Sequence, residues 1–196
     1  LMNYIINLCI NYSDHSIFIS NYLLNIFNPK NKFSVIHNGA DNEIFYDKNF
    51  TKNNDKFKVV THHWSSNKKK GLDIYNYLDK AILNDKYEDI EFTYIGNIPK
   101  NFKFKKTNYI KSMNGNKLSD ELNKHHAYIT ASLHEPAGMH HIEGSSCGLP
   151  VLYIDSGGIP EYCENYGIRY TKDNLLSKKY YLKKNYKTYK NKTSKY

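Results

Sequence analysis

The feature that most constrains the fold is an alternation between two kinds of segment. Short apolar runs rich in β-branched and aromatic residues occupy 57–63, 90–97, 127–132 and 151–155. Between the first two runs, in residues 72–83, apolar side chains recur at the spacing that places them on one face of a helix. Strands that alternate with helices at this spacing form βαβ units and a parallel sheet. We therefore expect an α/β fold with helices on both faces of the sheet.

Weaker segments extend the same pattern in both directions. Further strands are expected at 16–20, 33–39 and 109–113, and further helices at 21–27, at 118–126 and within GGIPEYCEN. Right-handed crossovers place every strand-to-helix loop at the carboxyl edge of the sheet, where ligands of open α/β sheets bind. The loops that reach this edge are WSSNKKKG, GNIPK, LHEPAGMH and SGGIPE. They contain the distinctive residues of the chain, so this edge is the expected site.

The basic charge does not indicate a nucleic-acid partner. The net charge is +9 over 196 residues, but Arg169 is the sole arginine among 28 basic residues. Nucleic-acid binders favour arginine for bidentate contacts and gather their charge on one face. Here lysine is spread along the chain and thickens only in the Lys/Tyr-rich tail, 173–196. We expect this tail to be a solvated, poorly ordered end, or else a truncated C-terminal helix.

The cysteines and the hydropathy pattern favour a cytoplasmic protein. Cys9, Cys147 and Cys163 have no CxxC spacing, which argues against a disulfide framework and against a zinc site. No apolar run approaches the roughly 20 residues of a membrane span. A peripheral association with a membrane stays open. The chain does not begin with Met, which suggests a fragment.

The loop LHEPAGMH carries the clearest chemistry. Pro136 and Gly138 tighten it, and glycine allows a ligand to approach the backbone closely. The helix that begins near Met139 presents free amides at the positive end of its dipole, which makes an anion site. Glu135 and Glu143 flank that site, and a carboxylate can accept hydrogen bonds from two vicinal hydroxyls. A ligand with hydroxyls at both ends and a diphosphate between them fits, which describes a nucleotide sugar.

The same residues resemble a known family. EPAGMHHIE is similar to the E-x7-E motif of retaining glycosyltransferases with the GT-B fold, most like family 4, and GSSCGLPVLY resembles its continuation. VIHNGADNEIF, NKKKG, YIGN and DSGGIPEYC resemble other segments of the family in the same order. The match covers about 14–170. It implies a Rossmann-like sheet that forms the C-terminal, donor-binding half of GT-B.

The resemblance implies a role for each matching residue. Glu143 would bind the ribose hydroxyls, and Glu135 would contact the donor sugar. The amides around Gly138 and Met139 would hold the diphosphate, and Lys70 would neutralise it. Glu135 and Lys70 are therefore the expected catalytic pair. No metal is expected, because a lysine and a helix N-terminus can replace magnesium.

The sequence departs from the family pattern at several positions. The arginine that usually contacts phosphate is missing, so Lys68, Lys69 or a histidine is expected to replace it. Ala137 stands where the family has an aromatic residue, which predicts a larger sugar pocket. His140 and His141 replace two apolar residues. We place His140 among the donor-binding residues, as the member of a histidine pair that hydrogen-bonds the sugar.

The three histidine pairs of the sequence invite a metal hypothesis, which the spacing disfavours. Adjacent residues point to opposite faces of a strand and diverge by about 100° on a helix. No pair can therefore chelate an ion by itself, and two different pairs would have to converge.

These observations predict a domain organisation and a function. Residues 1–37 are expected to be the remnant of an N-terminal acceptor domain with its linker, and 38–172 a nucleotide-sugar-binding domain. The predicted reaction transfers a sugar from a nucleotide diphosphate sugar to an unknown acceptor with retention. The alternative is a non-catalytic nucleotide-binding module, or an inactive fragment that needs a partner N-terminal half. A nucleic-acid module ranks third.

Overall fold

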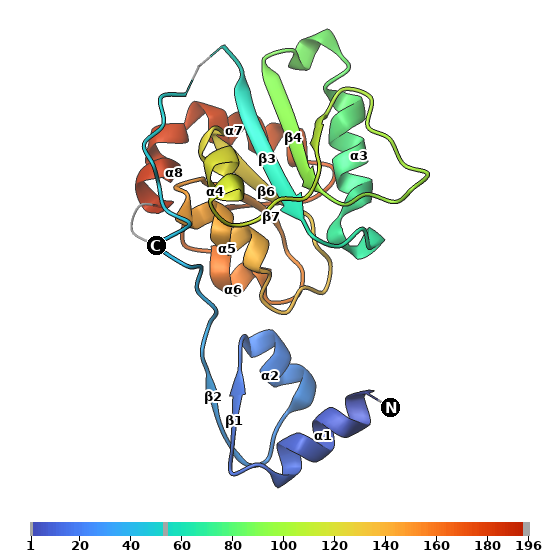
Figure 1. Cartoon of the computed structure of the whole chain (residues 1–196), viewed down its shortest axis with the longest axis vertical. Helices are drawn as coiled ribbons and strands as arrows, with labels where there is room; N and C mark the ends of the chain where they lie inside the picture. Colours follow the sequence, from blue (N-terminus) through green and yellow to red (C-terminus); the bar gives the residue numbers. More distant parts are fainter. Residues whose placement is uncertain (1, 53–54, 194–196) are drawn as a thin grey trace.

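A parallel sheet forms the centre of the protein. The computed structural model describes residues 2–52 and 55–193, and its main sheet has the strand order β5-β4-β3-β6-β7-β8 (Figure 1). The strands are β3 (Phe57–His63), β4 (Ile90–Gly96), β5 (Asn108–Ile110), β6 (Ala127–Thr130), β7 (Val151–Ile154) and β8 (Ile168–Tyr170). All neighbouring pairs are parallel.

The strand order reverses at the centre of the sheet. From β3 the chain adds β4 and β5 on one side, and then returns to place β6, β7 and β8 on the other. Val59 and Val60 of β3 pair with Ala127 and Tyr128 of β6 across this reversal. In open α/β sheets the crevice beyond the strand ends at such a point is where ligands bind.

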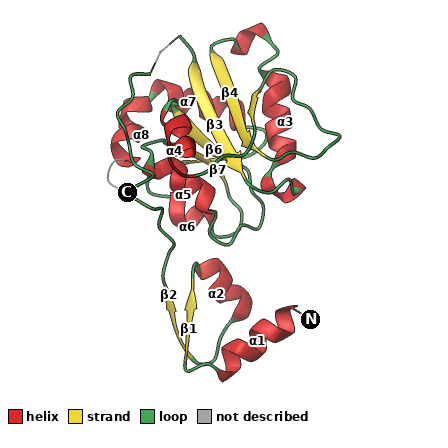
Figure 2. Ribbon diagram, viewed as in Figure 1, coloured by secondary structure: helices red, strands yellow, loops and turns green. Residues whose placement is uncertain are grey.

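Helices cover both faces of the sheet, as the sequence predicts (Figure 2). On one face, α3 (Leu72–Ala81) and α7 (Leu175–Lys184) bury apolar side chains in a core cluster with β3 and β4. On the other face, α4 (Gly115–Asn123), α5 (Met139–Ser146) and α6 (Ile159–Cys163) bury theirs in a second cluster. The expected α/β fold is therefore confirmed.

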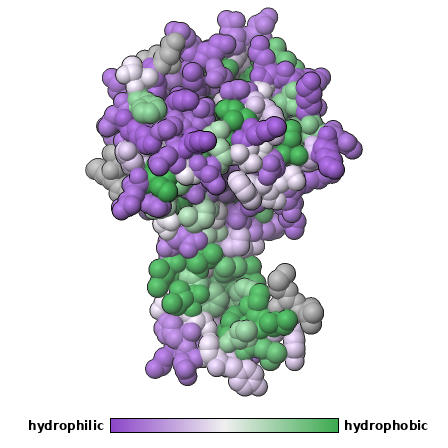
Figure 3. Space-filling model, viewed as in Figure 1, coloured by the Kyte–Doolittle hydropathy of each residue, from purple (hydrophilic) through white to green (hydrophobic). Residues whose placement is uncertain are grey.

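A small N-terminal unit lies apart from the sheet domain. It consists of α1 (Met2–Tyr12), β1 (His15–Phe18), α2 (Asn21–Phe27) and β2 (Lys32–Val35), with β1 and β2 paired in parallel. Figure 3 shows hydrophobic side chains gathered over this unit, whereas hydrophilic ones dominate the surface of the sheet domain.

Contacts with α6 attach the N-terminal unit to the sheet domain. The Glu161 carboxylate accepts hydrogen bonds from the backbone amides of Asn21 at 2.7 Å and Tyr22 at 2.8 Å. The Tyr162 hydroxyl donates to the carbonyl of Ile19. Burial raises the pKa of Glu161, but the amides of Asn21 and Tyr22 outweigh it and hold the pKa below its ordinary value.

The observed elements match most of the predicted ones. The predicted segments 21–27, 57–63, 90–97 and 151–155 correspond to elements that agree within one residue at each end. β8 and α1 lack a prediction, and the helix expected at 118–126 begins three residues earlier, at Gly115. The proposed division into domains at 37 and 172 stays a prediction.

The described part of the C-terminal tail is mostly helical, which agrees with the expected C-terminal helix and not with a poorly ordered end. The helices α7 and α8 (Tyr186–Thr193) occupy most of it, and Leu175 and Leu182 pack in the first core cluster. Lys179 is also buried, and its ammonium lies over the ring of Tyr180, 4.3 Å from the centroid. Aromatic rings thus cover lysine stems and hold this lysine-rich segment on the domain, which composition alone does not indicate.

No helix among the described residues is both long and apolar enough to cross a membrane.

Candidate functional site

A cavity of about 350 Å³ opens at the carboxyl edge of β3, β4 and β6. Six residues predicted for the site line it: Lys70, Glu135, Gly138, Met139, His140 and Glu143. The rest of the wall consists of His62, His63, Trp64, Ser65, Ile95, Gly96, Ser112, Met113, Asn114 and Leu118. The loops that follow three different strands therefore converge on one cavity, as the topology predicts.

One side of the cavity holds an ion pair between Lys70 and Glu135. Lys70 ends the short 3-10 turn Lys68–Lys70, and Asn67 caps this turn by accepting from the amide of Lys69 at 3.0 Å. The Lys70 ammonium contacts the Glu135 carboxylate. In addition, the amide of Leu133 donates to the carbonyl of Lys69 at 2.7 Å, which joins the two loops. The turn and the loop are therefore held together at the cavity wall.

A neighbouring loop supports the backbone of Glu135. The amide of Gly158 donates to the carbonyl of Glu135 at 2.8 Å. Gly157 has φ +65°, and a Cβ at this position would lie 2.3 Å from the same carbonyl oxygen. Only glycine allows so close an approach of the two backbones. The two glycines therefore allow this loop to position Glu135.

The helix α5 begins at the floor of the cavity. Gly138 precedes it with φ +69°, and a Cβ there would lie 2.7 Å from the His141 ring. Within the described part of the chain, no side chain caps the first amides of α5. These amides are therefore available to an anion at the positive end of the helix. Met139, 40% exposed, is at this end.

The other side of the cavity joins Glu143 to His62. Glu143 comes from α5 and His62 from the end of β3, and the distance from His62 Nε2 to the Glu143 carboxylate is 2.7 Å. Tyr128 of β6 lies behind this histidine, with its hydroxyl 3.2 Å from His62 Nδ1. Both glutamates of the motif are therefore paired with a cation or a hydrogen-bond donor.

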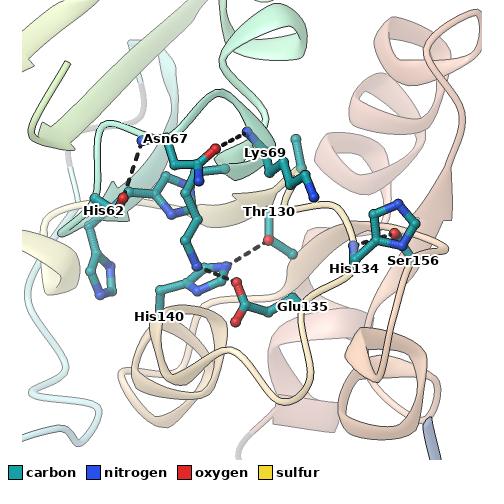
Figure 4. Close-up of polar contacts among 12 residues, drawn as sticks. His62, Asn67, Lys69, Thr130, His134, Glu135, His140 and Ser156 are labelled. Atoms are coloured by element: carbon teal, nitrogen blue, oxygen red, sulfur yellow. Dashed lines mark hydrogen bonds and ion pairs between the residues drawn. The ribbon is translucent and has the colours of Figure 1, made fainter. Parts of the chain in front are cut away.

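Buried histidines lie beneath the cavity. The rings of His63 and His140 are 4.7 Å apart, and those of His140 and His141 are 5.1 Å apart. His140 bonds to the Thr130 hydroxyl at 2.8 Å, beside Glu135 in Figure 4. Burial holds the pKa of His63 and His140 well below the ordinary value and lowers that of His141 to about 3. These rings are therefore neutral at physiological pH.

The histidine pairs converge, but not as a metal centre. Among residues 2–52 and 55–193, no group of three or more histidine, cysteine or carboxylate side chains has the geometry to hold an ion. The third pair lies elsewhere and is structural: His125 bonds Thr93 and the carbonyl of Glu121, and His126 accepts from the amide of Lys58.

The geometry corrects one expectation about the departures from the family pattern and narrows another. Ala137 is buried in the second core cluster and does not line the cavity, so its small size fits packing and does not enlarge the pocket. Of the three lysines in NKKKG, Lys70 alone lines the cavity. Of the expected replacements for the missing arginine, histidines line the cavity whereas Lys68 and Lys69 do not, and a phosphate contact by a histidine stays a prediction.

Sequence reasoning missed several cavity residues. His62 was considered only as one of a pair, although a polar residue at the carboxyl end of a central strand is itself a signal. Ser112, Met113 and Asn114 follow β5, whose loop is not one of the four that the sequence predicts at this edge. Their place could have been inferred from the same rule on strand ends.

The chain resembles solved glycosyltransferase structures over nearly its whole length. TarM superposes with a TM-score of 0.77 at 16% identity, covering 99% of this chain and 41% of TarM. Anabaena HepE in complex with UDP and glucose gives 0.75 at 16% identity, covering 98% and 60%. The C-terminal domain of the group 1 glycosyl transferase LpcC from Francisella tularensis gives 0.62 at 18%, covering 79% and 92%. The chain thus spans 41% to 60% of the first two proteins.

The sequence comparisons identify a family but no individual relative. No curated protein sequence matches the chain significantly. The family model, in contrast, matches residues 44–184, which include the complete cavity wall. Together with the parallel sheet and the superpositions, this match establishes that the chain belongs to the family of glycosyl transferases group 1.

Proposed function

We propose that the chain is the donor-binding part of a glycosyltransferase that transfers a sugar from a nucleoside diphosphate sugar with retention. The observation that carries the proposal is the convergence of Glu135, Glu143 and Lys70 on one cavity at the start of α5. Family membership and the UDP complex of HepE support the same ligand class. The acceptor is not specified by any of these residues.

The two ends of the cavity suit the two ends of such a donor. In the proposal, Glu143 accepts hydrogen bonds from the ribose hydroxyls, and Glu135 accepts from hydroxyls of the sugar. The amides at Gly138 and Met139 and the ammonium of Lys70, which line the same cavity, bind the diphosphate. His140 contributes a buried neutral ring to the wall, held by Thr130.

The same groups account for the chemistry of transfer. When the bond between the anomeric carbon and the diphosphate breaks, negative charge grows on the leaving phosphate. Lys70 and the α5 amides are positioned for this charge, and preorganised charge of this kind is usually the largest catalytic contribution. Glu135, already in contact with Lys70, keeps the ammonium at the point where sugar and phosphate meet. Retention is proposed from the E-x7-E pattern.

Calorimetric titration with UDP, GDP and ADP tests the donor site and identifies the base. Glu143→Ala is expected to weaken the preferred nucleotide by about 1.5–3 kcal/mol, or tenfold to a hundredfold, because hydrogen bonds to a charged group are lost. Glu88→Ala, which removes an exposed carboxylate outside the cavity, serves as the control. The proposal fails if none of the three nucleotides binds, or if Glu143→Ala and Glu88→Ala change the nucleotide affinity equally.

A second titration separates the roles of the two glutamates. Glu135→Ala is expected to spare the free nucleotide and to weaken the corresponding nucleotide sugar. The allocation of roles is wrong if this variant weakens both ligands equally.

The proposal includes no metal ion, because Lys70 and the α5 amides supply positive charge. The nucleotide affinity is then expected to be the same in Mg²⁺ and in EDTA. A loss of affinity in EDTA would instead assign part of the phosphate charge to a cation. A cytoplasmic location is likewise a proposal.

A nucleotide-binding module that needs another polypeptide for transfer is the second candidate. The exposed apolar side chains of the N-terminal unit favour it, since they are suited to contact a partner domain. Sugar transfer by the chain alone would exclude this candidate. Transfer only after mixing with an N-terminal half from another family member would support it.

A further inference from the structure

His62 has the most constrained position of the cavity residues without an assigned role. It is 8% exposed, is the penultimate residue of the central strand β3 and lines the cavity. The groups that face it come from three elements. They are Glu143 and His140 of α5, Tyr128 of β6, and its own neighbour His63.

The hydrogen bonds around the ring fix its orientation. A carboxylate can only accept, so the 2.7 Å contact requires Nε2 to carry hydrogen and donate to Glu143. On the other side of the ring, Nδ1 lies 3.2 Å from the Tyr128 hydroxyl, which also lies 3.3 Å from the carbonyl oxygen of His62. That hydroxyl oxygen in turn accepts from the backbone amide of His62 at 3.0 Å. The buried tyrosine therefore orients the imidazole, and the imidazole orients the carboxylate.

We propose that His62 is a positioning residue that aims Glu143 at the ribose of the donor nucleotide. This inference rests on the proposed function and deepens it. Donation from Nε2 occupies one side of the carboxylate and leaves its remaining lone pairs for the vicinal hydroxyls of the ribose. A carboxylate at the end of a flexible side chain loses rotamer freedom when it binds a ligand. The bond from His62 restricts the Glu143 rotamer before binding, which reduces that cost.

The test compares ribose and deoxyribose in calorimetric titrations of the full chain. The probes are UDP and 2′-deoxy-UDP, or GDP and 2′-deoxy-GDP if guanine is the selected base. His62→Phe keeps an aromatic ring without a donor and is expected to weaken the ribonucleotide about tenfold. It should affect the deoxynucleotide much less, so the preference for ribose collapses. His15→Phe, at an exposed histidine of the N-terminal unit, is the control.

Two further variants distinguish positioning from a merely structural role. His62→Gln places an amide donor close to the Nε2 position and is expected to keep the ribose preference. His62→Asn places its amide near Nδ1, on the Tyr128 side, and is expected to lose it. These two variants decide the question even if His62→Phe does not fold, which a thermal melt detects.

The possible outcomes separate this inference from the proposed function. If wild type prefers ribose and both His62→Phe and His62→Asn lose that preference, the inference is supported. If wild type prefers ribose and the preference survives in His62→Phe, or is equal in the Gln and Asn variants, the inference is overturned and the proposed function stands. If wild type binds no nucleoside diphosphate, both are overturned.

Discussion

The N-terminal unit and the sheet domain are folded by different kinds of interaction. The sheet domain buries two clusters of apolar side chains, one on each face of the sheet. Between residues 4 and 37, only Phe18 and Ser20 are buried, and α2 contains no buried residue. Local signals such as the Ser20 cap stabilise the α2 helix of the unit, but they do not supply a core.

The two regions therefore differ in the source of their stability. The unit exposes Tyr12 at 87%, Ile17 at 63% and Ile36 at 57%, whereas Leu152 and Ile129 of the sheet domain are fully buried. Burial of apolar surface is the main favourable contribution to folding. The unit therefore depends on its polar contacts with α6, and the sheet domain depends on its own interior.

Truncation of apolar side chains is expected to have the largest effect on stability and tests this difference between the two regions. Leu152→Ala is expected to lower the free energy of unfolding by about 2–5 kcal/mol, because it leaves a cavity in a packed core. Ile17→Ala, at an exposed position, should cost less than about 1 kcal/mol. Urea unfolding of both variants provides the measurement. Similar losses would show that the unit has a core comparable to that of the sheet domain.

Acid should destabilise the sheet domain through its buried histidines. Burial lowers the pKa of His125 to about 4. Between pH 6.5 and pH 4, His125 therefore binds a proton in the unfolded chain but not in the folded chain. Stability due to the neutral ring is therefore present above pH 6.5 and is lost as the pH falls toward 4, by about 3 kcal/mol in total.

Urea unfolding at pH 7, 6 and 5 measures this dependence. His125→Asn should reduce the loss of stability between pH 7 and pH 5. It should also lower the stability at pH 7, because the hydrogen bond to Thr93 is lost. His15→Gln, at an exposed histidine of the N-terminal unit, should retain the wild-type slope. An unchanged slope in His125→Asn would contradict the prediction.

Removal of the Glu161 carboxylate should release the N-terminal unit and leave the sheet intact. Glu161→Ala leaves the amides of Asn21 and Tyr22 without their acceptor, at a cost of about 1–3 kcal/mol. Hydrogen exchange at these amides should accelerate, while the thermal midpoint of the sheet domain stays the same.

Glu164→Ala, at an exposed carboxylate at the end of α6, is the matched control. Because the folded pKa of Glu161 lies below its unfolded value, the attachment should hold at neutral pH and weaken as the pH falls through the folded value. Unchanged exchange in Glu161→Ala would mean that other contacts hold the unit.

The smallest expected effect concerns Lys179 in α7. Burial lowers the pKa of Lys179 to about 8, and its Nζ has no hydrogen-bond partner among the described residues. Because burial disfavours the charged ammonium, Lys179→Met should leave the free energy of unfolding at pH 7 unchanged or raise it. Wild type should gain stability from pH 8 to pH 9, where the folded chain releases the proton before the unfolded one.

Chemical unfolding at pH 7, 8 and 9 tests whether Lys179→Met lacks this gain. Lys178→Met, at the preceding position, should retain it. A gain of the same size in all three proteins would rule out Lys179 as its source.

The sequence predicts the sheet and the cavity wall for related physical reasons. The strands Phe57–His63 and Val151–Ile154 are buried almost throughout because both faces of the sheet are covered, and this burial favours the apolar and β-branched residues that mark them in the sequence. Once the strands are known, parallel topology brings their terminal loops together, and this places Lys70 beside Glu135. The roles assigned to these residues remain predictions.

The features that sequence reasoning missed depend on contacts between distant segments. β8 has three residues, one of them the exposed Arg169, so its pattern is too short to recognise. The burial of Lys179 depends on the rings of Tyr87 and Tyr180, which come from different elements. The pairing of His62 with Glu143 joins β3 to α5. Local propensity carries no information about such contacts.

The central place of β3 also fixes when the site can arise during synthesis. β3 leaves the ribosome before every other strand of its sheet, and β4 can pair with one of its edges soon afterwards. The opposite edge stays open until β6 emerges, and Glu143 follows later still. A nascent chain that has made β3, β4 and β5 therefore has Lys70 and His62 but neither carboxylate, and no donor site can form on it before α5 is complete.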